Sequence, residues 1–170
     1  MRLASHLALA VLITVAGTGC IGGGPRPRQG DALIDFPVLA LDGKMTRLSQ
    51  VIGGRVAVFT FGATWCGPCA RQIAEFNRLR AAYPREKLAV IDVDLGEPAA
   101  LVKRHAAKHR VTFTTVLDPT SKAATAYGVS SIPVTLVVGR DGTVFYRGGY
   151  TPAGRLKAHI DKALAAAGQP

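Results

Sequence analysis

The sequence predicts one α/β domain, in which a mixed β-sheet is covered by helices on both faces. Apolar, β-favouring segments alternate with segments of helical spacing from residue 55 onward. Residues 56–61 carry no charge, as is typical of a strand buried on both faces of a sheet. The motif WCGPC at residues 65–69 then leads directly into a helical pattern. The chemistry is therefore expected at the carboxyl end of a strand.

The first elements expected are two short strands joined as a hairpin. Residues 31–41 alternate weakly in polarity and contain Pro37, which suits an edge strand or an extended lead-in. Asp42 and Gly43 form a strong turn signal, and a second short strand follows through Leu48.

The helix after the motif is expected because Ile73, Phe76 and Leu79 recur on one helical face, and Pro84 marks its end. Turn residues and periodicity place the other elements. They are a connector at 49–54, strands at 55–61 and 88–95, a helix at 98–110, a strand or extended run at 111–117, a short helix within 118–128, strands at 134–138 and 143–146, and a final helix from 152.

The N-terminus is expected to be a signal peptide at residues 1–19. Arg2 supplies a short positive region, and residues 7–16 form an apolar run. That run is about half of what a helix needs to span a bilayer. The folded domain is expected at residues 33–170.

Residues 17–20, Gly-Thr-Gly-Cys, resemble a bacterial lipobox, in which the cysteine is lipidated after cleavage. Gly17 departs from the usual pattern. The alternative is an ordinary secretory signal that leaves Cys20 as a free thiol. We favour lipidation, because an exposed spare thiol beside a disulfide-exchange site would be a liability. Residues 20–32, rich in Gly and Pro, are expected to be a flexible tether behind this lipid anchor.

Composition limits the classes of partner. The 170 residues suffice for one hydrophobic core that needs no stabilising disulfide bonds. The formal net charge is +10. The basic residues are scattered, apart from a denser stretch at 103–110, and neither a nucleic-acid motif nor an aromatic stacking set accompanies them. Nucleic acid is therefore not an expected partner, whereas attraction to a membrane or an acidic partner stays open.

Cys66 and Cys69 are predicted to form a redox pair. Cys66 lies at a helix N-terminus, where the helix dipole and exposure favour a thiolate nucleophile. Cys69 lies one turn on and is expected to resolve the mixed disulfide. A zinc site is disfavoured because no second C-x-x-C follows, and His105 and His109 lack a third ligand of matching spacing. No metal and no cofactor are expected.

The motif WCGPC after an apolar strand resembles the thioredoxin superfamily. Over residues 31–170 the chain resembles the TlpA/ResA type of membrane-anchored extracytoplasmic thiol-disulfide oxidoreductase, including the N-terminal hairpin that this type adds. The resemblance implies a thioredoxin-like fold. Gly67 and Pro68 match reducing thioredoxins, which implies a disulfide reductase; a thiol oxidase or isomerase is the alternative.

Ile132 and Pro133 form the second signature. A proline at the start of a strand cannot donate a hydrogen bond to the neighbouring strand, and a cis peptide bond in a tight turn avoids this problem. The Ile132–Pro133 bond is therefore expected to be cis, with a plain trans proline as the alternative. The resemblance implies that Pro133 packs beside the disulfide and that the backbone of Ile132 binds substrate. It also implies that Trp65 is a docking surface, for which a half-buried packing role is the alternative.

Resolution needs a base that takes the proton from Cys69. Classical thioredoxins keep an acid six residues before the first cysteine, where this chain has Thr60. The ResA-like pattern places a glutamate after the next strand, which makes Glu97 the candidate. Asp94 competes, water is a third possibility, and Glu97 also suits a plain helix start.

The expected function is reduction of disulfides in exported proteins, for example apocytochrome c, by a monomer anchored outside the cytoplasm, on the periplasmic or outer membrane face. A membrane thiol-transfer reductase is the expected electron donor. Two other classes of function are disfavoured. A redoxin-type peroxidase is disfavoured because Ala63 replaces the threonine it needs, and copper delivery of the Sco type because the cysteine spacing is one residue short.

Overall fold

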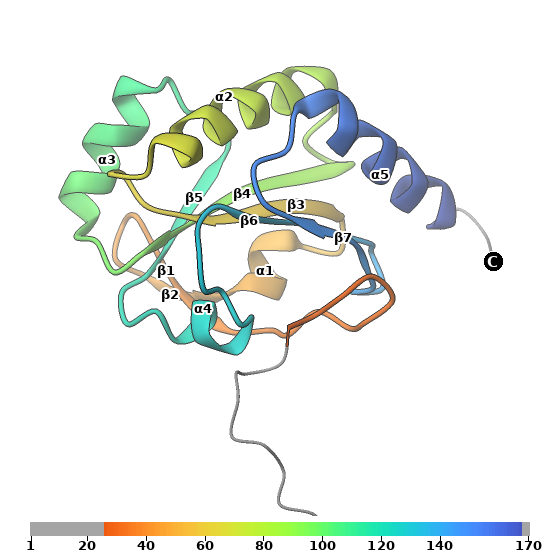
Figure 1. Cartoon of the computed structure of the whole chain (residues 1–170), viewed down its shortest axis with the longest axis horizontal. Coiled ribbons are helices and arrows are strands. Elements are labelled where there is room, and N and C mark those ends of the chain that lie inside the picture. The colour runs from red at the N-terminus through yellow and green to blue at the C-terminus, as the bar shows by residue number, and fades with distance from the viewer. Residues whose placement is uncertain (1–25, 168–170) are drawn as a thin grey trace, which may run out of the picture.

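The computed structural model describes residues 26–167, which form one mixed sheet with helices on both faces. The strands are β1 (Pro37–Ala40), β2 (Met45–Arg47), β3 (Val56–Gly62), β4 (Leu88–Leu95), β5 (Thr114–Asp118), β6 (Val134–Val138) and β7 (Val144–Gly148). The helices are α1 (Leu48–Ile52), α2 (Gly67–Ala82), α3 (Ala99–Lys108), α4 (Lys122–Ala126) and α5 (Ala153–Ala166). Helices α2, α3 and α5 lie on one face and α1 and α4 on the other (Figure 1).

The sheet order is β2-β1-β5-β4-β3-β6-β7. Strands β3, β4 and β5 run parallel, while the other neighbours pair antiparallel. Strand β3 is buried along its whole length, as expected from its lack of charge. Because β3 lies inside the sheet, the motif that follows it is held by strands on both sides.

Alternate side chains of β3 supply both cores. Phe59 and Phe61 point to the face of α1 and α4, where they pack around the ring of Tyr127. Val58 points to the opposite face, where it packs with Phe76 of α2 beneath the helices. Because successive side chains of a strand point to opposite faces, this pattern also fixes the face to which each residue at the end of β3, just before the motif, is directed.

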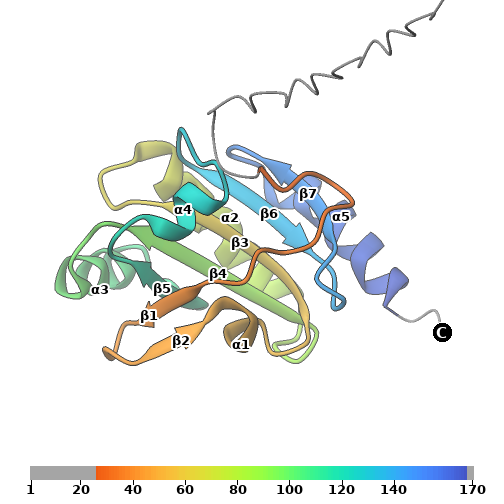
Figure 2. The ribbon, with the colours of Figure 1, turned by 90° about the horizontal axis from the view of Figure 1, so that it is seen from below.

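The predicted N-terminal hairpin is confirmed, since β1 pairs antiparallel with β2 and also with β5. Residues 26–36 cross the lower face of the sheet from the β7 edge to β1 (Figure 2). The Gly30 N–H donates to the Val144 carbonyl at 2.8 Å, and the Tyr127 hydroxyl donates to the Ile34 carbonyl at 2.7 Å. The packed structure thus begins before the boundary expected at residue 33. The predicted signal peptide and Cys20 lie outside the described residues.

Three predicted elements differ in detail. The connector at 49–54 contains α1, because Leu48 and Ile52 are buried in the lower core. The run at 111–117 becomes a strand only from residue 114. The helix expected within 118–128 is shorter because Asp118 stays in β5 and accepts a hydrogen bond from the Ala124 N–H at 3.0 Å. Between residues 26 and 167, no helix is long and apolar enough to cross a membrane.

Candidate active site

The two cysteines of the motif form a disulfide at the N-terminus of α2. Their Cα atoms lie 5.2 Å apart, and the Cys69 N–H donates to Cys66 Sγ at 3.2 Å. Cys66 is the N-terminal capping residue, and Pro68 lies in the first turn, where a missing N–H leaves no helical bond unmade. The expected exposure of Cys66 is not found, since it is 5% exposed and Cys69 4%. In this oxidised form, both sulfurs are covered by neighbouring segments.

One of those segments carries Pro133. The Ile132–Pro133 peptide bond is cis, as expected. Cys66 Sγ lies 3.8 Å from the Ile132 carbonyl oxygen. The second signature of the sequence thus lies directly against the first.

A hollow of about 520 Å³ lies beside this contact. Trp65 borders it and is 75% exposed, which removes the packing alternative for this side chain. The other lining residues are apolar or uncharged: Leu95, Ser121, Ala124, Thr125, Val129, Ser130, Ser131 and Ile132. The hollow therefore offers a neutral surface beside the disulfide, next to both residues expected to meet substrate.

Glu97 lies in the loop between β4 and α3. Its carboxylate accepts two hydrogen bonds from Thr64, from the backbone N–H at 2.5 Å and from the hydroxyl at 2.7 Å. Thr64 is two residues before Cys66, so Glu97 holds the loop that enters the motif. Its assignment as the base for Cys69 stays a prediction.

Asp92 and Asp94 are buried on the face of the sheet that α2 covers, 8% and 3% exposed respectively. Burial, followed by the charge of Glu97, raises the pKa of Asp92 to about 7 and that of Asp94 to about 8. Asp94 Oδ1 has no hydrogen-bond partner among the described residues. The sequence predicts Asp94 as a competing base, whereas Asp92 is not among the residues predicted for the site. The sequence feature that could have pointed to Asp92 is the presence of two acids at alternate positions of a buried strand.

Gly62, the last residue of β3, separates Asp92 from Cys69. A Cβ atom at Gly62 would lie 3.5 Å from Cys69 Sγ and 3.7 Å from Asp92 Oδ1. The sulfur and the carboxylate therefore border the same small space. Thr60, which replaces the acid of classical thioredoxins, lies deeper in β3, 3.2 Å from the Thr135 hydroxyl.

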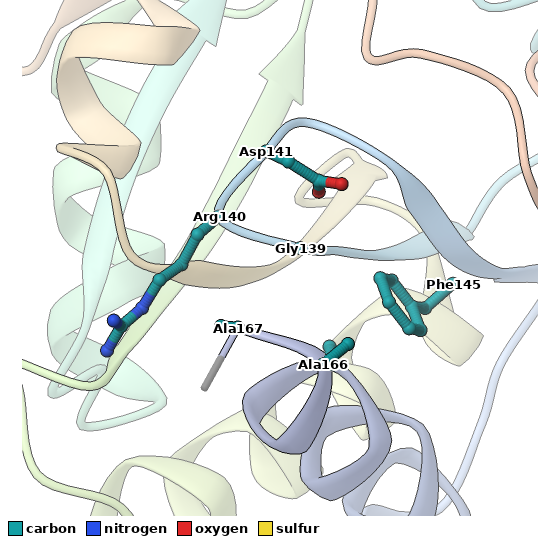
Figure 3. A pocket seen from close by; sticks show the side chains of 7 residues that line it. Gly139, Arg140, Asp141, Phe145, Ala166 and Ala167 are labelled. Carbon is teal, nitrogen blue, oxygen red and sulfur yellow. The ribbon is translucent and has the colours of Figure 1, made fainter. Parts of the chain in front are cut away.

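Two other features lie apart from this site. The His105 and His109 rings stack with centroids 4.3 Å apart, but no group of three metal-ligating side chains occurs within residues 26–167. A second hollow, of about 320 Å³, lies between the β6–β7 turn and the end of α5 (Figure 3). Val138, which precedes the lining residue Gly139, pairs with Ala57 at the start of β3. This hollow therefore lies at the opposite end of β3 from the cysteines.

Comparison with known proteins gives the family. The AhpC/TSA family model matches residues 29–147. The chain belongs to the AhpC/TSA family. The chain is 32% identical over 115 residues to a curated relative, the thiol-disulfide oxidoreductase ResA of Geobacillus thermodenitrificans. The match covers 68% of this chain and 66% of the relative. The ResA of Geobacillus kaustophilus matches with the same identity and coverage. The chain thus spans about two thirds of the length of these relatives.

Solved structures share the fold of this AhpC/TSA family member. A Chlorobium tepidum protein assigned as thiol:disulfide interchange protein DsbE superposes with a TM-score of 0.72 at 28% identity, over 81% of this chain and 99% of that one. StoA of Bacillus subtilis shares the fold with a TM-score of 0.62 at 21% identity, over 74% of this chain and 96% of that one. The expected thioredoxin-like fold and the resemblance to ResA-type proteins are confirmed.

Proposed function

We propose that the chain is a thiol-disulfide oxidoreductase that works through Cys66 and Cys69. The observation that carries this proposal is the Cys66–Cys69 disulfide at a helix N-terminus, against the carbonyl of Ile132. The helix N-terminus favours a thiolate at Cys66 once the disulfide is reduced. The ResA relatives carry the same activity in their names.

In the reducing direction, the Cys66 thiolate attacks one sulfur of a substrate disulfide and displaces the other as a thiolate. Cys69 then loses its proton and attacks Cys66 Sγ, which releases the second substrate thiolate. Two electrons pass to the substrate, and both of its thiolates take up protons. The protein is left with the Cys66–Cys69 disulfide, the state described here.

The substrate class that we propose is an exported polypeptide that carries a disulfide. Trp65 offers exposed apolar area beside the disulfide, and the Ile132 backbone borders the same hollow. Apocytochrome c is one candidate, and a membrane thiol-transfer reductase is the proposed electron donor; both come from the ResA resemblance. Gly67 and Pro68 favour the reductase over a thiol oxidase or isomerase.

We place the protein outside the cytoplasm, attached to the membrane through a lipid on Cys20 after cleavage of residues 1–19. The apolar run at 7–16 and the lipobox-like residues 17–20 support this. Cys20→Ala in the full chain should move the protein from the membrane fraction to the soluble extracytoplasmic fraction. A variant that stays in the membrane fraction would contradict lipidation at Cys20.

Insulin reduction with dithiothreitol as electron donor tests the activity. The wild type should accelerate precipitation of the insulin B chain, Cys66→Ser should not, and Cys69→Ser should trap a mixed disulfide on Cys66. Cys20→Ser is the matched control and should keep full activity. Insulin reduction that survives Cys66→Ser contradicts the assigned nucleophile. Peroxide consumption that exceeds disulfide reduction would favour the redoxin alternative.

A further inference from the structure

The space beside Gly62 connects the second cysteine to a buried acid. The Gly62 position lies 3.5 Å from Cys69 Sγ and 3.7 Å from Asp92 Oδ1, both measured from the place where a side chain would begin. Gly62 adopts ordinary extended backbone in β3, so its conformation does not require glycine. The missing side chain leaves open the space that the two atoms share.

Two further carboxyl groups continue from Asp92 toward the surface. Asp94 lies two residues on along β4 and faces the same side, and it lies close enough to Glu97 to feel the charge of that carboxylate. Glu97 is partly exposed in the loop before α3. From Asp92 through Asp94 to Glu97, the three acids thus pass from buried positions to a partly exposed one.

The groups that face Asp92 come from four elements. They are Thr60 on β3, Thr115 on β5, Cys69 on α2 and Glu97 in the loop before α3, with Asp94 on the same strand. His105 of α3 lies near Glu97 and feels its charge. The charges that act on the Asp92 carboxylate are thus those of acids, which favour a bound proton.

We propose that Asp92 accepts the proton of the Cys69 thiol across the space beside Gly62, and that Asp94 and Glu97 pass it to solvent. This inference rests on the proposed thiol-disulfide exchange and assigns the base that the exchange requires. It replaces a direct transfer from Cys69 to Glu97, whose carboxylate is engaged by Thr64.

In the mixed disulfide, Cys66 is bonded to the substrate sulfur and Cys69 is a thiol. The S–H bond of Cys69 breaks, and its proton goes to the Asp92 carboxylate. The electron pair left on Cys69 Sγ forms the bond to Cys66 Sγ, and the Cys66–substrate bond breaks. The substrate leaves as a thiolate that takes a proton from solvent, while Asp92 returns its proton through Asp94 and Glu97.

The pKa of Asp92, raised to about 7 by burial and by the charge of Glu97, supports this role. A base whose pKa lies near the working pH combines a large ionised fraction with a useful affinity for the proton. An ordinary exposed aspartate, with a pKa of about 3.9, would take the thiol proton much less readily.

The test uses the full reduced protein and an aromatic disulfide, dithiobis-nitrobenzoate, which releases one coloured thiolate per exchange. The first equivalent reports attack by Cys66, and the second reports resolution by Cys69. Asp92→Asn should leave the first phase unchanged and slow the second by about 100-fold at pH 7, the lower end of what general-base catalysis contributes. The pH profile of its second phase should also move up toward the ordinary thiol pKa of about 8.5.

Gly62→Ala supplies a second variant that keeps all three acids. Its methyl group would meet both atoms at ordinary contact distance and fill the shared space. It should slow the second phase as well. Gly154→Ala is the matched control, because Gly154 is exposed in α5 and a Cβ atom there would meet nothing within 4 Å. A second phase with unchanged rate and pH profile in either Asp92→Asn or Gly62→Ala overturns the inference. Loss of the first phase in the wild type would instead overturn the proposed function.

Discussion

Thr64 donates two hydrogen bonds to the Glu97 carboxylate, one from its backbone N–H at 2.5 Å and one from its hydroxyl at 2.7 Å. The two residues are 33 positions apart, and Thr64 lies in the loop that delivers Cys66. Burial, followed by the charge of Glu97, raises the pKa of Asp94. Glu97 therefore couples the position of the active-site loop to the buried acids.

Glu97→Gln should leave the fold intact but slow the resolving step and shift its pH profile. The amide keeps one acceptor for Thr64 but removes the charge at the outer end of the acid series. The second phase of the aromatic-disulfide reaction, followed from pH 5 to 9, measures this. Thr64→Val is the control, because it removes only the hydroxyl bond and leaves the charge of Glu97 in place. A rate unchanged across this range would remove Glu97 from the mechanism.

Trp65→Ala should weaken binding of polypeptide substrates without lowering stability, because the side chain is 75% exposed. We expect KM for insulin to rise about tenfold, equivalent to about 1.4 kcal/mol. The reaction with the small aromatic disulfide should keep its rate, because that reagent does not need the docking surface. Met45→Ala is the matched control, since Met45 is 68% exposed in the N-terminal hairpin. Equal effects of the two substitutions would argue against docking at Trp65.

Much of this site was predictable because its signals are local. The strand before Cys66, the helix after it and the Ile132–Pro133 turn each follow from a few consecutive residues. The N-terminal hairpin was predictable for the same reason, because Asp42 and Gly43 define its turn within a short segment.

The role inferred for Asp92 could not be read from the sequence. Two acids at alternate positions of a strand show a shared face, but they do not show what covers that face. Only the pairing of Asp92 with Thr60, two residues before Gly62, places its carboxylate near Cys69. Helix α1 was missed for a related reason, since burial of Leu48 and Ile52 outweighs the weak helical signal of its five residues.

Gln72→Leu should lower the free energy of unfolding by about 2–6 kcal/mol. Gln72 is fully buried, and its amide donates to the Thr151 carbonyl at 3.0 Å and accepts from the Thr151 N–H at 2.7 Å. Leucine leaves both buried backbone groups unpaired, at about 1–3 kcal/mol each. Urea denaturation measures the loss. The exposed neighbour Arg71 is the control, and Arg71→Ala should cost less than about 1 kcal/mol. Equal midpoints for the two variants would contradict this account.

Asp92→Asn should stabilise the protein at pH 8 although it slows resolution. Burial and the charge of Glu97 raise the Asp92 pKa from 3.8 to about 7, so between these values the folded protein holds a proton that the unfolded chain has lost. The unfolding free energy of the wild type therefore falls as the pH rises through this window, and it stays lowered above pH 7. Asparagine removes this loss, with an expected gain on the order of a few kcal/mol at pH 8 and almost none near pH 4.

Urea denaturation of wild type and Asp92→Asn at pH 4 and pH 8 measures this difference. Asp42→Asn is the control, because Asp42 lies in an exposed turn and its pKa is lowered by the Lys44 N–H, so the same substitution should bring no gain at pH 8. An Asp92→Asn protein no more stable than wild type at pH 8 would show that the carboxylate is not held at a raised pKa. A gain confined to pH 8 and paired with slow resolution would show that the fold gives up stability to keep a proton acceptor beneath α2.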